Sequence, residues 1–338
     1  MESDLNERQI GAYTGDAKQI EEMLKTLPEV VRGYYYSIQL RKEAKTCWTY
    51  IWHVSRYLDS INNDLERIDD DSVSRFLVEH RTKLNAKGEV VNTSFSYQKL
   101  IWSSLNSFFM YLRKKRIIAE NPCDLVERPN NEDNPQRVAL DSRQLRLLMK
   151  AVSDGAGSYE SKVRQLQWKK RDSLILAMLI DTGMRRTALT EINVDDIDFE
   201  NRKINITDKR MTYLTYDIPD SLMNRIKEWL EDRAEKLEEY GRTSDALFIS
   251  NQGDRISDKS VDRLVRKYSY AAFGVEISPH KLRASFVTNY YKASGHDINA
   301  TCKAVGHKSI TTTARYIVDE NKSRTNAVNF MDNIICDL

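Results

Sequence analysis

Residues 279–316 read PHKLRASFVTNYYKASGHDINATCKAVGHKSITTTARY, a stretch rich in cationic and phenolic side chains. Its first residue, Pro279, suits the first turn of a helix, and the pattern predicts a helix that continues to Ala293. His280 and Arg283 are three positions apart on that helix, so they project from the same face. The start of the stretch therefore predicts a paired histidine and arginine.

The end of the same stretch predicts a break in the chain. His307 and Tyr316 are nine positions apart, and a continuous helix would put them on opposite faces. If the two side chains act together, the chain must turn between them. Gly306 and Ser309 are suitable places for a turn and a new helix cap.

The cationic and phenolic side chains of this stretch offer a set of two arginines, two histidines, a lysine and a tyrosine without matching carboxylates. Such a set suits a phosphodiester reaction that needs no metal ion. Arginines would hold the non-bridging oxygens of a pentacovalent transition state. A tyrosine would serve as covalent nucleophile, and a lysine or histidine would protonate the departing oxygen. The sequence has no Walker A loop, dinucleotide fingerprint, GxSxG elbow or HExxH motif.

The order of the motifs resembles one family, the tyrosine recombinases, which include the phage-integrase and Xer-type enzymes. That family carries a Thr-Gly-Leu/Met-Arg box, a hairpin lysine, an HxLR box, a Gly-His box and a terminal tyrosine. The matching segments here are Asp-Thr-Gly-Met-Arg185, Ile-Thr-Asp-Lys209, His280-Lys-Leu-Arg283, Val-Gly-His307 and Thr-Thr-Thr-Ala-Arg-Tyr316. Helical spacing over most of the chain and strand-like pieces at 198–206 and 213–218 predict a mostly helical catalytic domain with a small antiparallel hairpin (α+β), behind a helical domain. The resemblance implies that the first domain is of the core-binding type.

The same resemblance implies roles for the residues that surround the phosphate. Arg185 and Arg283 would bind the scissile phosphate, and His307 would hydrogen-bond one of its oxygens. His280 would assist proton transfer to or from the nucleophile.

The resemblance also implies the covalent step. Tyr316 would attack to give a 3′-phosphotyrosyl link, and Lys209 would be the general acid for the 5′-hydroxyl leaving group. The family carries out this reaction as a homotetramer on two double-stranded DNA sites, through a Holliday junction and without a metal ion or other cofactor. It leaves open whether accessory DNA-bending proteins take part.

The chain departs from the family pattern after the first arginine. The family usually has Arg-x-x-Glu there, whereas this chain has Ala188 at the position of the glutamate. Glu191, one helical turn later, is a candidate substitute for the missing carboxylate. Arg186 is a rival to Arg185 for the catalytic role, although the Gly-Met-Arg match favours Arg185.

The hairpin lysine has alternatives as well. Lys203 and Arg210 lie close to Lys209 in the sequence, and the register of a hairpin is not determined by the sequence pattern alone. The resemblance favours Lys209, and the other two cations remain alternatives.

Length and composition describe an ordinary globular protein. The chain has 338 residues, 52 Lys and Arg against 50 Asp and Glu, and a formal net charge of +2. Its longest apolar run, Leu174 to Ile180, is far shorter than the about 20 residues of a membrane-spanning helix. The N-terminus lacks the features of a signal peptide, so we expect a cytoplasmic, nucleoid-associated protein. The four cysteines show no metal-ligand spacing and no disulfide framework.

The length favours two domains, which we place around a polar stretch that contains two prolines. A helical DNA-binding domain of the core type is predicted for 1–128, a linker for 129–140 and a catalytic domain for 141–316. The spacing of hydrophobic residues predicts a tail helix in 317–338. This helix would dock on its own domain or be exchanged between subunits.

The first domain is predicted to be a bundle of four or five helices. Asp71 and Ser72 would cap a short helix that continues through Leu84. The last long helix ends in four consecutive cations. These cations either lie in solvent at the helix end, where they interact favourably with the negative end of the helix macrodipole, or contact phosphates.

A net charge near zero, taken alone, argues against a nucleic-acid partner. Binding would then depend on cations gathered on one concave surface. The candidate DNA-binding residues are Arg113, Lys114, Lys115, Arg116, Lys281 and Lys308.

The predicted function is a site-specific recombinase, an integrase that moves a mobile element. The alternatives are an Xer-type resolvase of chromosome or plasmid dimers and a type IB topoisomerase, which shares the chemistry. A catalytically inactive DNA-binding accessory protein is the alternative from a different class.

Overall fold

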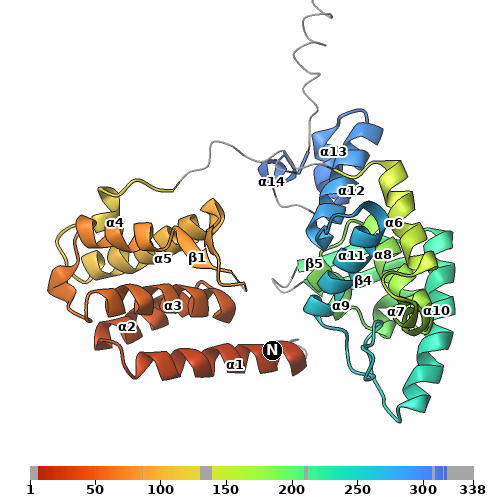
Figure 1. The fold of residues 1–338 in the computed structure, drawn as a ribbon, viewed down its shortest axis with the longest axis horizontal. Helices are drawn as coiled ribbons and strands as arrows, with labels where there is room; N and C mark the ends of the chain where they lie inside the picture. The colour runs from red at the N-terminus through yellow and green to blue at the C-terminus, as the bar shows by residue number, and fades with distance from the viewer. Residues whose placement is uncertain are drawn as a thin grey trace, which may run out of the picture. The chain divides into compact units, whose positions relative to one another are not determined.

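The protein consists mainly of helices, arranged in two compact units that divide between Asn134 and Pro135 (Figure 1). Short antiparallel strands accompany the helices in both units, which confirms the predicted fold class. Among the described residues, no helix is both long enough and apolar enough to cross a membrane. The computed structural model describes residues 7–85, 87–129, 139–208, 212–306, 309–314 and 316–317.

In the N-terminal unit, five helices are described, and they enclose one hydrophobic core. Their bounds are α1 (Glu7–Leu24), α2 (Glu29–Gln39), α3 (Ala44–Ser60), α4 (Asp70–Glu79) and α5 (Phe95–Lys114). The core lies largely between α3 and α5, where Ile51, Leu58, Leu105 and Phe108 are completely buried. Tyr57 packs edge-on against Phe109, with ring centroids 5.4 Å apart. Short 3-10 turns cover Leu65–Arg67 and Pro122–Asp124.

Helix α4 begins earlier and ends earlier than predicted. Asp69 caps it, because the Asp69 carboxylate accepts the N–H of Ser72 at 2.7 Å and the Ser72 hydroxyl accepts the N–H of Asp69 at 3.2 Å. The helix ends at Glu79, and β1 (Thr82–Leu84) pairs antiparallel with β2 (Val90–Asn92). The prediction of a helix through Leu84 is wrong, because the backbone of these residues bonds to a strand further along the chain.

The C-terminal unit packs helices around a small sheet. Its helices are α6 (Ser142–Asp154), α7 (Tyr159–Leu166), α8 (Lys169–Asp181), α9 (Arg186–Glu191), α10 (Asp220–Glu239), α11 (Asp258–Phe273), α12 (Pro279–Ala293), α13 (Ile298–Ala304) and α14 (Ile310–Ala314). Helix α8 packs against α6, α10 and α12, and its residues Leu174, Ile175 and Met178 are completely buried.

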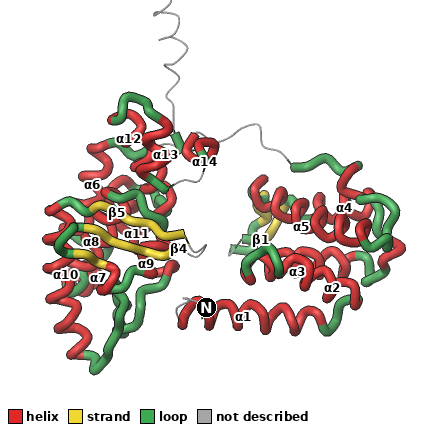
Figure 2. Tube along the Cα trace, turned by 180° about the vertical axis from the view of Figure 1, so that it is seen from behind, coloured by secondary structure: helices red, strands yellow, loops and turns green. Residues whose placement is uncertain are grey.

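The sheet of the C-terminal unit has the strand order β3-β4-β5 and is antiparallel throughout. Its strands are β3 (Ile197–Asp198), which follows a 3-10 turn at Val194–Asp196, β4 (Lys203–Asp208) and β5 (Thr212–Asp217). Figure 2 shows these strands lying across the front of the helices. The predicted hairpin is thereby confirmed.

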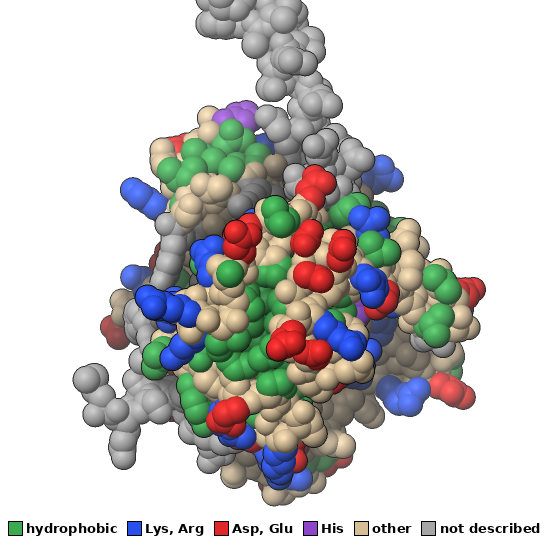
Figure 3. Space-filling model, turned by 90° about the vertical axis from the view of Figure 1, so that its left-hand side faces the viewer, with side chains coloured by type: hydrophobic (Ala, Val, Ile, Leu, Met, Phe, Trp, Pro, Cys, Tyr) green, Lys and Arg blue, Asp and Glu red, His purple; other side chains and the backbone are tan. Residues whose placement is uncertain are grey.

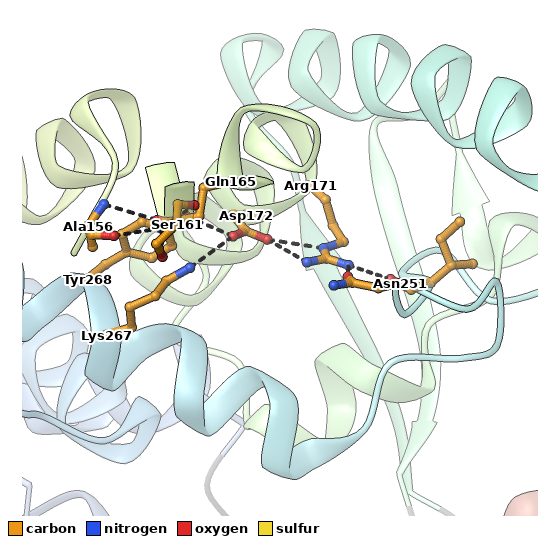
Figure 4. Close-up of polar contacts among 9 residues, drawn as sticks. Ala156, Ser161, Gln165, Arg171, Asp172, Asn251, Lys267 and Tyr268 are labelled. Atoms are coloured by element: carbon orange, nitrogen blue, oxygen red, sulfur yellow. Dashed lines mark hydrogen bonds and ion pairs between the residues drawn. The ribbon is translucent and has the colours of Figure 1, made fainter. Parts of the chain in front are cut away.

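A buried polar network joins α8 to α11 and to the loop that precedes α11 (Figure 4). The Asp172 carboxylate accepts two bonds from the Arg171 guanidinium, at 2.9 and 3.1 Å, and one from the Tyr268 hydroxyl at 2.8 Å. Arg171 also donates to the carbonyl of Ile249 and the side chain of Asn251. Both charged side chains are less than a tenth exposed. Asp172 is the counter-charge of the buried Arg171, and its Oδ2 also pairs with Lys267 of α11 at 3.7 Å.

Removing one charge from this network should destabilise the C-terminal unit. We expect Asp172→Asn to lower its free energy of unfolding by about 3 kcal/mol, because Arg171 is then buried without a counter-ion. Urea unfolding measures the change. Asp254→Asn is the control, because Asp254 pairs with Arg242 at 3.3 Å but is exposed. Equal effects of the two substitutions would refute the network's contribution to stability.

Charges of both signs share the surface of the N-terminal unit. On the face turned to the viewer in Figure 3, hydrophobic side chains are bordered by acidic and basic ones. Tyr36, Leu40, Val78, Phe95 and Met110 are among the exposed hydrophobic residues of this unit. No single sign of charge therefore covers this face.

Candidate active site

A cavity of about 290 Å³ in the C-terminal unit brings together four of the six predicted site residues. Arg185 lies just before α9, His280 and Arg283 lie on α12, and Tyr316 follows α14. The other lining residues are Met184, Arg186, Thr187, Asp262, Ser278 and Pro279. We call it the active-site cavity because it holds these predicted site residues, and its lining includes three arginines, a histidine and a tyrosine.

The turn between α8 and α9 places Arg185 in the cavity. Gly183 has a φ of +59°, and a Cβ at this position would lie 2.4 Å from the ring of Phe286. Glycine is the residue that fits both the conformation and the space. The Thr182 hydroxyl accepts the N–H of Met184 at 3.2 Å and closes the turn. The Thr-Gly-Met-Arg motif is thus a helix-ending turn that presents an arginine.

Arg283 is a buried cation, only 2% exposed. Its guanidinium donates to the carbonyl oxygens of Gly183 and, at 2.9 Å, Val305. Burial and the nearby Arg185 lower its pKa, whereas Tyr216 and Tyr316 act in the opposite direction. Its Nε is buried and has no hydrogen-bond partner among the described residues. Arg283 therefore holds two segments together and keeps a donor for an anion.

Tyr316 is anchored through its backbone and lies beside His280. The two ring centroids are 5.1 Å apart. The Tyr316 N–H donates to the carbonyl of Thr313 at 2.9 Å, and its carbonyl accepts the hydroxyl of Thr288 at 3.0 Å. Sequence reasoning missed Thr288, which lies on α12 and holds the backbone of Tyr316 beside that helix.

The predicted break between His307 and Tyr316 is confirmed. Helix α13 ends at Ala304 and α14 begins at Ile310. Gly306 has a φ of +62°, and the Ser309 hydroxyl accepts the N–H of Thr311 at 3.2 Å. The chain therefore turns at the two positions that the sequence indicated.

Three of the predicted residues, Lys209, His307 and Lys308, lie outside the described residues, as does Arg210. Of the alternatives for the hairpin lysine, Lys203 is described. It pairs with Asp217, at the end of β4 far from the β4–β5 turn, and does not line the active-site cavity.

The carboxylate in the cavity is Asp262 of α11. Glu191, the substitute suggested by the sequence, is not among the lining residues. Asp262 lies 76 positions after Arg186, with which it pairs at 3.5 Å, and it pairs with Arg266 at 2.6 Å. The only sequence signal for Asp262 was its spacing of four residues from Arg266 on one helix.

Comparison with known proteins identifies the family. A model described as the phage integrase family matches residues 139–323, more than half of the chain. The chain belongs to this family, the tyrosine recombinases. It is 28% identical over 215 residues to tyrosine recombinase XerC of Alcanivorax borkumensis, a match that covers 63% of this chain and 66% of that relative. It is 29% identical over 253 residues to XerC of Pelobacter propionicus, covering 73% and 76%.

A solved structure supports the fold of this tyrosine recombinase. The XerH site-specific recombinase, bound to a palindromic difH substrate in a post-cleavage complex, superposes with a TM-score of 0.65 at 21% identity. That match covers 86% of this chain and 80% of the other. Together with the family match, it confirms the resemblance that the motifs indicated.

The N-terminal unit of the recombinase has a second, larger cavity, of about 1110 Å³, between α2 and α5. We call it the α2–α5 cavity. Its lining includes five cations and no acidic residue among the described residues: Arg41, Lys42, Lys114, Lys115 and Arg128. Aromatic rings lie between them, and the Arg128 guanidinium lies 5.3 Å from the ring of Trp102. Cations interleaved with aromatic side chains suit a nucleic-acid backbone.

Only part of the predicted cation cluster at the end of α5 lines the α2–α5 cavity. Lys114 and Lys115 line it, whereas Arg113 and Arg116 do not. Arg113 instead pairs with Asp124 at 3.3 Å. Sequence reasoning missed Arg41, Lys42 and Arg128, because they join the cavity from segments distant in the sequence. In the C-terminal unit, Lys281 does not line the active-site cavity.

Proposed function

We propose that this tyrosine recombinase is a site-specific DNA recombinase that cuts and rejoins strands through a 3′-phosphotyrosyl intermediate. The observation that carries the proposal is the Tyr316 phenol beside His280 and the buried Arg283 in one cavity. Guanidinium groups next to a nucleophile stabilise the negative charge that develops on the attacked phosphate. Positive charge supplied by arginines in this way does not require a metal ion.

In the proposed cleavage step, the Tyr316 Oη forms a bond to phosphorus while the bond from phosphorus to the 5′ oxygen breaks. His280 accepts the phenolic proton, and Lys209 donates a proton to the departing 5′ oxygen. Arg185 and Arg283 bind the non-bridging oxygens. In the rejoining step a 5′-hydroxyl of the partner strand attacks the same phosphorus, and the proton returns to the phenolate.

Two observations support a location for Lys209 and His307 near this cavity. The carbonyl of Val305 accepts a hydrogen bond from the guanidinium of the cavity residue Arg283 at 2.9 Å. A Cβ on Gly306 would lie 3.2 Å from a methyl group of Leu214 on β5, the strand that begins three residues after Lys209. The β4–β5 hairpin therefore contacts the turn that precedes His307. We propose that His307 hydrogen-bonds a phosphate oxygen there.

The proposed partners are double-stranded DNA with two recombination sites and three further copies of this chain. The names of the XerC relatives and the DNA-bound XerH structure support the choice of DNA. Strand exchange through a Holliday junction needs four active tyrosines, which supports a tetramer. We propose that the protein acts in the cytoplasm on nucleoid DNA, and that the tail in 317–338, outside the described residues apart from 317, docks on a neighbouring subunit.

The direct test is covalent trapping. A DNA duplex with a nick just beyond the scissile phosphate loses its short 5′-hydroxyl fragment after cleavage, so a phosphotyrosyl adduct accumulates. We expect the wild-type protein to form an adduct that withstands detergent, with the modified peptide mapped to Tyr316 by mass spectrometry. An adduct on another residue, or relaxation of supercoiled DNA without any defined site, would contradict the proposal.

The α2–α5 cavity is the proposed contact for the DNA backbone in the N-terminal unit. We expect Lys114→Gln combined with Lys115→Gln to weaken DNA binding about tenfold near 0.1 M salt. The salt slope, which is the steepness with which the logarithm of the binding constant falls with the logarithm of the salt concentration, should decrease by about two. Filter binding at several salt concentrations measures both. Arg113→Gln is the matched control on the same helix end, with a smaller expected loss because Arg113 already pairs with Asp124. A control as damaging as the double variant would count against this contact.

For the biological role we propose integration and excision of a mobile element, as the sequence analysis predicts. Resolution of chromosome or plasmid dimers is the competing role. A pair of reporter plasmids, one with the ends of the flanking element and one with the host's dimer-resolution site, separates the two. Recombination at the element ends supports the integrase role, and recombination restricted to the resolution site overturns it.

A further inference from the structure

Arg186 is an arginine of the active-site cavity that the family motifs leave without a role. Its Nη1 lies 3.5 Å from Oδ1 of Asp262, the limit of a hydrogen bond. Its Nε is buried and has no hydrogen-bond partner among the described residues. The side chain is 37% exposed, far more than that of Arg283. Arg186 is thus held at one end by a weak ion pair and keeps most of its donors for another acceptor.

Asp262 is itself fixed by other charges. Its Oδ2 accepts a short bond of 2.6 Å from Nε of Arg266, and Arg266 lies 3.5 Å from Glu276. The four side chains form a row of alternating sign from Arg186 to Glu276. Asp262 lies closer to Arg266, at 2.6 Å, than to Arg186, at 3.5 Å, so most of its negative charge is shared with Arg266. Asp262 can therefore orient Arg186 but neutralises the charge of Arg186 only in part.

We propose that Arg186 is a further phosphate-binding residue, which contacts the DNA phosphate next to the scissile one, with Asp262 as its positioning residue. The inference rests on the proposed function and adds a substrate contact to the same cavity. Arg283 is buried in the cavity, whereas Arg186 is open to solvent. Successive phosphates follow one another with a rise of about 3.4 Å along a strand, so a cation near the scissile phosphate can reach the neighbouring one. A guanidinium with free donors binds a phosphate through paired hydrogen bonds.

The test separates binding from chemistry. We expect Arg186→Gln to weaken binding of the nicked duplex about tenfold near 0.1 M salt and to lower the salt slope by about one. At saturating DNA the rate of adduct formation should stay within about twofold of wild type, because a neighbouring phosphate adds binding and not chemistry. Arg186→Lys keeps the charge and should restore the slope. Asp262→Asn should cause a smaller loss, and combining it with Arg186→Gln should add little, because the two act as one unit.

The control is a second ion pair of the same kind. Arg242 and Asp254 pair at 3.3 Å, are exposed and do not line the active-site cavity. Arg242→Gln and Asp254→Asn should leave affinity and slope unchanged. An unchanged slope for Arg186→Gln, with or without a lower melting temperature, would overturn the inference. Failure of the wild-type protein to form any adduct would instead overturn the proposed function, so the two failures are distinguishable.

Discussion

Tyr316→Phe is expected to form no detectable covalent adduct with the nicked duplex, a loss of at least about 10⁴-fold relative to wild type. The substitution removes the oxygen that would bond to phosphorus and keeps the ring that packs 5.1 Å from His280. Its backbone contacts with Thr288 and Thr313 do not involve the phenol, so the fold should persist. Binding of the duplex should remain within about twofold of wild type.

The matched control is Tyr290→Phe, which removes a phenol from the same helix as His280. Tyr290 is exposed and stacks on Phe286, and it is not among the residues that line the cavity. We expect this variant to form as much covalent adduct with the nicked duplex as the wild-type protein does. A persistent adduct in Tyr316→Phe would mean that another residue is the nucleophile.

Arg283→Lys is expected to slow adduct formation at saturating DNA by about 10³-fold. Lysine keeps the positive charge but has no planar fork. One ammonium group cannot reach the carbonyls of Gly183 and Val305 and also bind a phosphate oxygen in the guanidinium's geometry. Because the loss concerns the transition state, it should appear in the maximal rate and much less in DNA affinity. Single-turnover kinetics measure the two separately.

A second buried arginine controls for loss of structure. Arg233 also donates to two backbone carbonyls, those of Ala246 and Ser244, and burial lowers its pKa. It does not line the active-site cavity. We expect Arg233→Lys to lower the melting temperature about as much as Arg283→Lys and to leave the single-turnover rate near wild type. Similar rates for the two variants would assign Arg283 a structural role alone.

Local signals predicted much of the secondary structure. Asp141, a residue type favoured at helix N-caps, caps α6, and its carboxylate accepts the N–H of Gln144 at 2.7 Å. Pro279 begins α12, and the chain turns at Gly306. Each of these features depends on hydrogen bonds or backbone angles within a few residues, so the sequence carries the information locally. The short strand β1 was missed because its partner lies several residues further along the chain.

The sequence by itself determined the family, the order of the motifs and the residue types of the predicted active site, because these depend only on the linear order of the residues. Only the tertiary structure decided that Asp262, from a distant part of the chain, lies in the cavity and pairs with Arg186. It also decided that Arg283 is buried between two backbone carbonyls. Burial and ion pairing depend on which distant segments pack together, and the spacing of residues along the chain does not specify that packing.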